Sequence, residues 1–179
     1  MTTVDRVRVG ASVALLALAC ATMAPPAAIA FASGTTGQVE EYHVKAALLV
    51  NFTKFVQWPH DGALTLCVVG DAPGLDQALD AREVKGRQIV TRRLEVRDDA
   101  SRCDVLFIGA SVGRFTGDVL ARLALAPVLT VGETDPFLND GGIVRFFVEA
   151  NRIRFQINAK AADQRGLKIS SQLLSLAAR

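Results

Sequence analysis

The chain has 179 residues, of which 50% are hydrophobic, and its formal net charge at pH 7 is +2. This length fits a single domain that can bury its own core. Without Asp5, Arg6 and Arg8 of the N-terminal segment, the 20 basic and 18 acidic side chains fall to 18 and 17. Such a near-neutral balance gives no reason to propose nucleic acid or an anionic membrane as a partner.

The first 32 residues have the pattern of a secretory signal peptide. Arg6 and Arg8 form a short basic region, and an apolar stretch rich in Val, Ala and Leu runs over residues 9–23. Small residues follow, with Ala-x-Ala cleavage sites at 28–30 and 30–32. We therefore expect residues 1–32 to be removed on export and residues 33–179 to form one soluble periplasmic domain.

Cys20 leaves a second processing route open. Residues 17–20 resemble a lipobox, in which Cys20 would be acylated and become the mature N-terminus. Ala17 stands where such a motif usually has Leu, and the downstream Ala-x-Ala sites compete for processing.

Residues 41–59 are expected to form one helix of about four to five turns. We expect it to stop at Pro59, since proline disfavours helical geometry in the residue before it. On a helical wheel, one wide side of this helix is apolar and consists of Ala47, Trp58, Val44, Phe55, Leu48, Phe52, Val56 and Leu49. We call this side the apolar arc.

Asn51 falls inside this arc. A buried Asn must hydrogen-bond its amide, so we predict that its side chain ties the helix to a backbone group in a neighbouring element. The alternative is a polar contact inside a binding groove. Trp58 is either a core residue or an interface anchor, and with Phe55 it marks the end of the helix where a partner could bind.

The centre of the chain alternates short apolar runs with helical patterns. The runs at 64–70, 103–109 and 128–132 predict buried strands, and 89–96 predicts a more exposed strand. Helices are expected at 75–84 and 115–125, the second with Phe115, Val119, Leu120 and Leu123 on one side. This alternation implies right-handed crossovers and a mainly parallel sheet.

The C-terminal third has a different pattern. Residues 152–158 alternate strictly between polar and apolar and follow the apolar run at 143–149 closely, which predicts an antiparallel hairpin at a sheet edge. Ala150 and Asn151 fit its tight turn. A terminal helix is expected at 170–178. The fold class is therefore α/β: a single three-layer domain with a mainly parallel central sheet, a C-terminal antiparallel hairpin and helices on both faces.

If Cys20 leaves with the signal peptide, Cys67 and Cys103 remain, each in or beside an apolar strand-like run. In an oxidising exported compartment two cysteines form one disulfide by default, so we predict a bridge between them. The alternative is two buried thiols that pack as small hydrophobic side chains.

Three turns that follow buried strands carry polar residues that could line a ligand site: Asp71, Ser111 and Glu133. In open parallel sheets, ligands bind at these carboxyl ends. The same residue types are also ordinary turn and helix-capping residues.

The sequence holds neither a metal-ligand constellation nor a catalytic one. His43 and His60, the only histidines, lie at opposite ends of the predicted first helix, too far apart to share a metal. Neither a nucleotide-binding glycine motif nor a Gly-x-Ser-x-Gly elbow occurs. We expect no metal, no cofactor and no enzymatic activity.

The chain resembles the YfiR-like periplasmic proteins. The resemblance begins with the aromatic helix at 41–59 and covers essentially the whole mature chain in order, through 66–71, 103–108, 129–132, 141–144, 155–158 and 166–177.

This resemblance implies a non-enzymatic regulator that binds the periplasmic sensor domain of an inner-membrane diguanylate cyclase, or a related sensor kinase, and holds it inactive. It also implies that a peptidoglycan-binding outer-membrane lipoprotein can sequester the regulator, which raises cyclic di-GMP and promotes biofilm formation. Dimerisation and a structural disulfide are further features of the family, and Cys67 with Cys103 look like that pair. From the residues alone, the alternative is a periplasmic small-ligand-binding protein that uses Asp71, Ser111 and Glu133.

Overall fold

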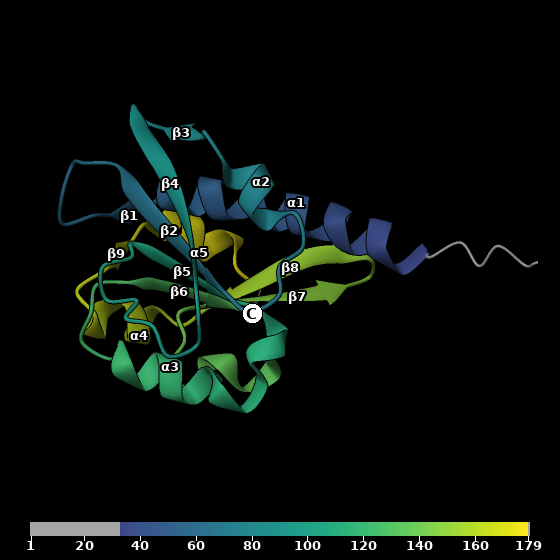
Figure 1. Cartoon of the computed structure of the whole chain (residues 1–179). Helices are drawn as coiled ribbons and strands as arrows, with labels where there is room; N and C mark the ends of the chain where they lie inside the picture. The colour runs from purple at the N-terminus through teal and green to yellow at the C-terminus, as the bar shows by residue number, and fades with distance from the viewer. Residues whose placement is uncertain (1–32, 179) are drawn as a thin grey trace, which may run out of the picture. The chain divides into compact units, whose positions relative to one another are not determined.

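A computed structural model describes residues 33–178 of the chain, so the predicted signal peptide and the alternative at Cys20 lie outside the described residues. Its centre is a seven-stranded sheet (Figure 1). In spatial order the strands are β3 (Glu83–Val84), β4 (Arg87–Leu94), β2 (Leu64–Val69), β5 (Val105–Ile108), β6 (Leu129–Gly132), β7 (Val144–Glu149) and β8 (Arg152–Ile157). The five strands from β4 to β7 are parallel, whereas β3 and β8 pair antiparallel at the two edges. The predicted α/β class is confirmed.

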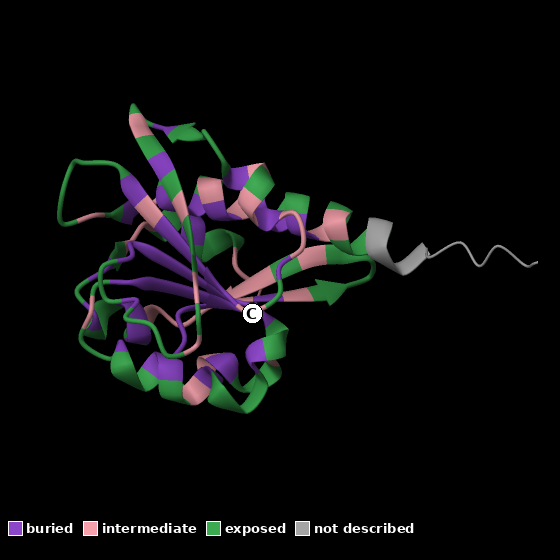
Figure 2. Cartoon of the chain, viewed as in Figure 1, coloured by how far each residue is buried: buried purple, intermediate pink, exposed green. Residues whose placement is uncertain are grey.

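Helices cover both faces of this sheet. They are α1 (Ser33–Thr53), α2 (Leu75–Leu79), α3 (Thr116–Arg122), α4 (Ala159–Gln164) and α5 (Ser171–Leu176), with 3₁₀ segments η1 (Ala110–Phe115) and η2 (Asp135–Leu138). One apolar cluster packs α1, α2 and α5 on the sheet, and a second packs α3, η1 and η2 on the other face. Figure 2 shows the central strands as the buried layer between them. Within residues 33–178, no helix combines the length and apolarity needed to cross a membrane.

The predicted hairpin is present. β7 and β8 pair over their whole lengths, from Val144 opposite Ile157 to Glu149 opposite Arg152. Ala150 and Asn151 form the turn with φ values of 47° and 58°, the left-handed geometry that such a two-residue turn requires.

The first helix ends earlier than predicted. α1 stops at Thr53, and β1 (Val56–Gln57) pairs antiparallel with β9 (Lys168–Ile169) in a separate two-stranded sheet. Pro59 disfavours helix only in the residue before it, but pairing with β9 extends the chain from Val56 onward. The indole N–H of Trp58 donates to the carbonyl of Thr53 at 3.0 Å and so satisfies one of the free carbonyls at the helix end.

The buried face of α1 is also rotated from the predicted one. Its buried positions are Tyr42, Lys45, Ala46, Leu49, Phe52 and Thr53, whereas Ala47 and Val44 are exposed. The prediction for Asn51 is wrong: its side chain is exposed and accepts from Nζ of Lys54, three residues further along the chain, at 2.9 Å. The apolar arc of the helical wheel included Asn51 and left out Lys45. In the structure Lys45 is buried, because the carboxylates of Glu41 and Glu133 pair with its ammonium group.

Three smaller elements differ from the prediction. α2 ends at Leu79, since the chain turns into β3 and a hairpin with β4. The helix expected at 115–125 is split into η1 and α3, and Phe115 is exposed beneath the Arg114 guanidinium. In α5 only Leu173 is buried, while Leu174 and Leu176 are exposed.

The predicted disulfide joins Cys67 of β2 to Cys103, which lies two residues before β5. Their Cα atoms are 5.9 Å apart, and both side chains are buried in the second apolar cluster. The bridge therefore fastens two neighbouring central strands.

Thiol titration of the denatured, non-reduced protein should find Cys67 and Cys103 unreactive. Replacing both by Ala opens a loop with a sequence separation of 36, which should lower the free energy of unfolding by about 3–4 kcal/mol on the chain-entropy model. Urea unfolding measures this loss. Two reactive thiols at these positions would contradict the bridge.

Candidate functional site

The three polar turns singled out in the sequence meet in space. Asp71 follows β2, Ser111 follows β5, and Glu133 follows β6. From β2 the chain goes on to β4 on one side, and from β5 to β6 on the other, so the ends of β2 and β5 flank a topological switch point. Ser111 Oγ accepts from the backbone N–H of Asp71 at 2.7 Å, and Glu133 Oε2 accepts from the backbone N–H of Ala110 at 3.3 Å.

Helix α1 contributes two side chains to the same place. The Tyr42 hydroxyl lies 3.0 Å from Glu133 Oε2, to which it donates, and 3.3 Å from the carbonyl oxygen of Asp71. The buried Lys45 ammonium pairs with the carboxylates of Glu133 and Glu41. We call Tyr42, Lys45, Asp71, Ser111 and Glu133 the strand-end cluster.

Charges inside the strand-end cluster are compensated. Glu133 is nearly buried, yet its two oxygens together receive the Lys45 ammonium, the Tyr42 hydroxyl and the Ala110 N–H. Burial, and next the negative charge of Glu133, raise the pKa of the Tyr42 hydroxyl well above its usual value, so it stays neutral and can donate.

The crevice at the switch point is filled by the protein itself. Gly70 has a φ of 80°, which lets the chain turn sharply after β2. A side chain at Gly109 would collide with the backbone of Asp71, so the two turns touch directly. Tyr42 then bonds to the turn after β2 and to the turn after β6. The arrangement joins α1 to the sheet.

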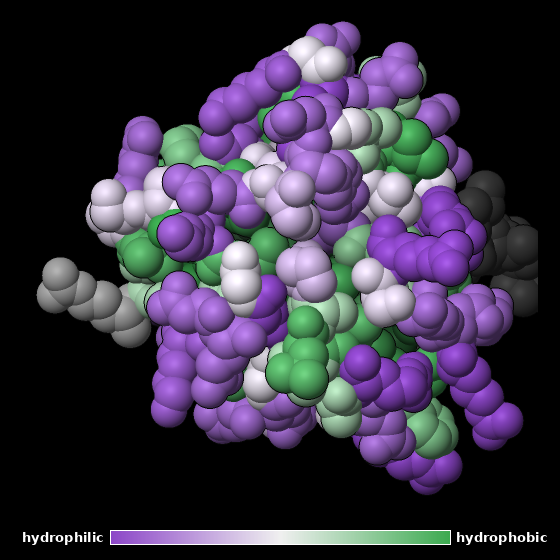
Figure 3. Space-filling model, turned by 90° about the vertical axis from the view of Figure 1, so that its left-hand side faces the viewer, coloured by the Kyte–Doolittle hydropathy of each residue, from purple (hydrophilic) through white to green (hydrophobic). Residues whose placement is uncertain are grey.

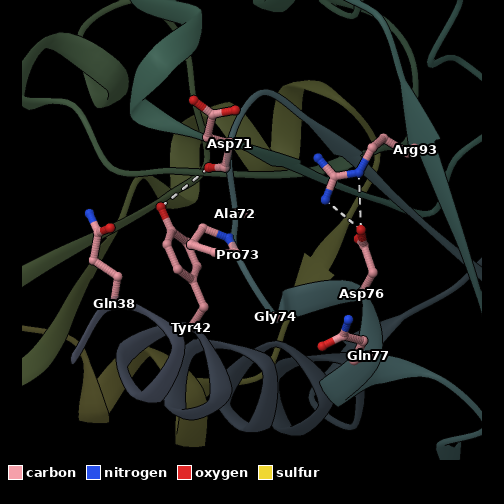
Figure 4. Close-up of a pocket in the computed structure, with 9 residues that line it drawn as sticks. All are labelled: Gln38, Tyr42, Asp71, Ala72, Pro73, Gly74, Asp76, Gln77 and Arg93. Atoms are coloured by element: carbon pink, nitrogen blue, oxygen red, sulfur yellow. Dashed lines mark hydrogen bonds and ion pairs between the residues drawn. The ribbon is translucent and has the colours of Figure 1, made fainter. Parts of the chain in front are cut away.

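Two open hollows lie on either side of Tyr42. The larger, of about 570 Å³, is polar and is lined by residues that include Gln38, Asp71, Asp76 and Arg93 (Figure 4). Arg93 is engaged there, since its Nε lies 3.0 Å from Asp76 and its Nη1 donates to the Gly70 carbonyl at 2.9 Å. Figure 4 shows that the backbone carbonyl of Asp71 points toward the Tyr42 hydroxyl, whereas the Asp71 carboxylate points away from it.

The smaller hollow, of about 260 Å³, lies beside Lys45 and Glu133. Side chains of β7 form its apolar wall, among them Phe146, Phe147 and Val148. This hollow connects the strand-end cluster to the hairpin. Among residues 33–178, no three His, Cys, Asp or Glu side chains are grouped so that they could hold a metal ion.

Asn51, Phe55 and Trp58 lie at the other end of α1 from the strand-end cluster. Phe55 and Trp58 are half-buried against the first apolar cluster, so their observed contacts are structural. Figure 3 shows the side of the domain that lies on the left in Figure 1, where hydrophobic side chains are scattered among hydrophilic ones. Leu125, in the loop before β6, is 90% exposed.

The sequence alone did not reveal Tyr42 and Lys45 as site residues. The available signal was their spacing of three residues, with Glu41 four residues before Lys45 on the same side of the helix. Their main partner, Glu133, lies 88 residues after Lys45, which no local pattern indicates.

Comparison with known proteins gives a matching family and solved structures with a similar fold. A family model described as YfiR/HmsC-like matches residues 42–178. Proteins of that family are regulators rather than enzymes, and the match suggests a periplasmic regulator of diguanylate cyclase signalling.

A crystal structure of a conserved domain protein from Vibrio cholerae O1 biovar El Tor strain N16961 has a similar fold, with a TM-score of 0.56 and 15% sequence identity. The alignment covers 76% of this chain and spans 58% of the length of that protein. At this identity the likeness concerns the fold alone.

Lys45→Met should destabilise the protein strongly, because Glu133 would remain buried without its cation. We expect a loss of about 3–5 kcal/mol in the free energy of unfolding. Lys54→Met is the matched control at an exposed lysine just after the same helix and should change it by less than about 0.5 kcal/mol. Equal losses in urea unfolding would contradict the role of the buried pair.

Tyr42 is the only tyrosine, so the ultraviolet absorbance of tyrosinate reports on this single group. Tyrosine in the unfolded chain ionises near pH 10, at about its reference pKa. In the folded protein the pKa is raised, so Tyr42 should ionise only at higher pH. Its contribution to stability should be complete below about pH 10 and decline above it. The stability difference between wild type and Tyr42→Phe should therefore shrink above about pH 10; a constant difference would contradict this.

Proposed function

This chain belongs to the YfiR/HmsC-like family, and we propose that it binds and represses the periplasmic sensor domain of an inner-membrane diguanylate cyclase. Repression lowers cyclic di-GMP and biofilm formation. The proposal assigns the chain no catalytic step, so its activity rests on the surface that it offers to another protein.

The observation that carries this proposal is an exposed apolar groove between α1 and the tip of the β7–β8 hairpin. Its volume is about 530 Å³, and it is lined by Gly37, Glu40, Glu41, Val44, Val148, Asn151, Arg152 and Ile153. We call it the α1–hairpin groove. Val44 is 46% and Val148 57% exposed, and charged side chains form the rim. Apolar surface with a polar rim is typical of protein-binding sites.

A small-ligand receptor is the second candidate. It is favoured by the meeting of Asp71, Ser111 and Glu133 at the switch point, where α/β proteins bind ligands. In this chain, however, Tyr42 and Lys45 already donate hydrogen bonds to the Glu133 carboxylate. Ser111 accepts a hydrogen bond from the backbone N–H of Asp71. A binding module agrees better with these contacts.

The proposal includes two further partners. The regulator forms a homodimer, and a peptidoglycan-binding outer-membrane lipoprotein sequesters it. Release of the cyclase then follows from competition for the regulator or from a change in the redox state of Cys67 and Cys103.

Deleting the gene should raise cyclic di-GMP in cells that contain the cyclase, and the wild-type gene should restore the lower level. A Val44→Asp/Val148→Asp variant should fail to restore it. The same variant should bind the purified sensor domain at least about tenfold more weakly, because two apolar contacts at the centre of the interface would be replaced by charges. Val44 and Val148 are exposed, so stability should change little.

Leu125→Asp is the matched control, since it places the same charge on an exposed apolar position outside the α1–hairpin groove. It should restore repression fully. Unchanged cyclic di-GMP after deletion, in a strain that expresses the cyclase, would refute the proposed function. Saturable binding of a small molecule that Glu133→Gln abolishes would favour the second candidate.

A further inference from the structure

Strand β8 is an open edge of the central sheet. It is the last strand in the spatial order, and β7 is its partner on the inner side. Asn158 donates to the Ile143 carbonyl at 2.8 Å across the hairpin, and in an antiparallel pair such bonding residues alternate. Arg152 and Arg154 therefore turn their backbone groups toward β7, whereas Ile153 and Phe155 turn theirs outward.

The outward side of β8 is occupied only at one end. The backbone N–H of Ala178 donates to the Phe155 carbonyl at 2.8 Å, so the C-terminal segment already begins to pair along this edge. Within residues 33–178, the backbone N–H and C=O of Ile153 and the N–H of Phe155 have no protein partner. A short stretch of edge is thus left unpaired beside the hairpin tip.

The two faces of this edge differ in chemistry. Ile153 and Phe155 face α1, where Phe155 packs on Phe52 with ring centroids 4.7 Å apart. Ile153 also lines the α1–hairpin groove. By strand register Arg152 and Arg154 lie on the opposite face, and both are exposed. Arg152, next to the hairpin turn, also reaches the end of the groove. Glu149 lies 3.7 Å from Arg154 and is the cross-strand partner of Arg152, and such exposed pairs contribute little.

We infer that the edge of β8 around Ile153 accepts an extended segment of a partner protein as an added strand, with alternating apolar and acidic side chains. Backbone hydrogen bonds to Ile153 and Phe155 would set its register. Alternate side chains would then enter the α1–hairpin groove, and those between them would face Arg152 and Arg154. The inference rests on the proposed function, since it names the part of the partner that this surface recognises.

Charge decides against a second copy of this chain as the occupant. Antiparallel pairing of β8 with itself about Ile153 would place Arg152 opposite Arg154 on both sides of the two-fold axis. Like charges directly opposite each other destabilise a strand pair. Exposed arginines on an edge therefore discourage self-association, whereas carboxylates on an incoming strand turn the same residues into ion pairs.

A helix in the groove would contact Val44 and Val148 but could not bond to the backbone of Ile153, because its own backbone groups are paired internally. The unpaired backbone of the edge thus favours a strand over a helix. Figure 1 shows the hairpin and the N-terminal half of α1 projecting side by side from the rest of the described residues.

The test uses the disulfide-intact protein and a short synthetic peptide of alternating valine and glutamate. Fluorescence anisotropy should show saturable binding, and NMR should show slower amide exchange at Ile153 and Phe155 in the complex. The same peptide with lysine in place of glutamate should bind more weakly. An Arg152→Glu/Arg154→Glu variant should reverse that preference.

Ile153→Pro removes an outward N–H without touching the β7–β8 ladder, which is where proline is tolerated in a sheet. It should weaken peptide binding about fivefold to tenfold. Ile153→Val keeps the donor and is the matched control. Circular dichroism establishes that both variants are folded.

Several outcomes would overturn the inference. The peptide could bind without slowing exchange of the Ile153 amide, or the acidic and basic peptides could bind with equal affinity. The Ile153 and Phe155 amides could also already exchange slowly in the dilute protein without peptide. A dimer that protects Ile153 and dissociates on dilution would identify a second copy as the occupant. If the sensor domain binds wild type and Ile153→Pro equally, the added strand is refuted and the proposed function stands. If it binds neither while the acidic peptide binds, the proposed partner is refuted and the strand site stands.

Discussion

The ion pair between Lys45 and Glu133 is the interaction on which the arrangement of this domain depends. Both side chains are nearly buried, so each would be costly to bury without the other. Because Lys45 lies in α1 and Glu133 follows β6, the pair fixes the rotation of the helix about its axis. Only one rotation places Lys45 on Glu133 and still buries Leu49 and Phe52 on the sheet. That rotation turns Val44 outward, which gives one wall of the α1–hairpin groove.

The same pair also explains why Glu133 is already engaged at the site expected from topology. The carboxyl ends of β2, β5 and β6 meet as predicted, but Glu133 faces α1 rather than a ligand. Tyr42 adds a hydroxyl where a ligand atom would otherwise bind, and its raised pKa keeps that hydroxyl protonated. A position that other α/β folds use for recognition thus joins a helix to the sheet here. This agrees with the proposal that recognition takes place at the margin of the sheet, beside α1 and the hairpin.

The sequence predicted those parts of the structure that leave a local pattern. β2, β5 and β6 are buried apolar runs, and the hairpin alternates strictly, so each could be placed within a few residues. Asp71, Ser111 and Glu133 could be grouped because the ends of parallel strands meet at one edge. The strands β1 and β9 have only two residues each, too few to show the alternating pattern of a strand. The sequence analysis therefore included β1 in the first helix and did not predict β9.

Buried polar residues could not be predicted in this way. Lys45 was left out of the apolar arc, although the fold buries it between Glu41 and Glu133, and Glu133 is remote in sequence. Arg165 is a second case: burial lowers the pKa of its guanidinium, which donates to the Thr130 hydroxyl at 3.0 Å and to the Gly141 carbonyl at 2.9 Å. In both cases the side chain bridges segments far apart in the chain. Asn51 shows the opposite behaviour. It is a polar residue among apolar ones, but its side chain stays exposed and bonds to the nearby Lys54 instead of to a neighbouring element.

The two walls of the α1–hairpin groove are held in fixed relation before any partner arrives. Phe52 of α1 stacks on Phe146 of β7 at 5.7 Å and meets Phe155 of β8 edge-on at 4.7 Å, so aromatic packing joins the helix to both strands of the hairpin. Lys45 and Glu133 hold the same helix about two turns further toward its N-terminus. A partner would therefore meet a preorganised surface and lose little affinity to ordering it. On the proposed function, release would not require the groove to unfold, because a competitor that covers Val44, Val148 or the Ile153 edge would suffice. In such a device the specificity lies in the charges around the groove, because the apolar walls alone would accept any apolar segment.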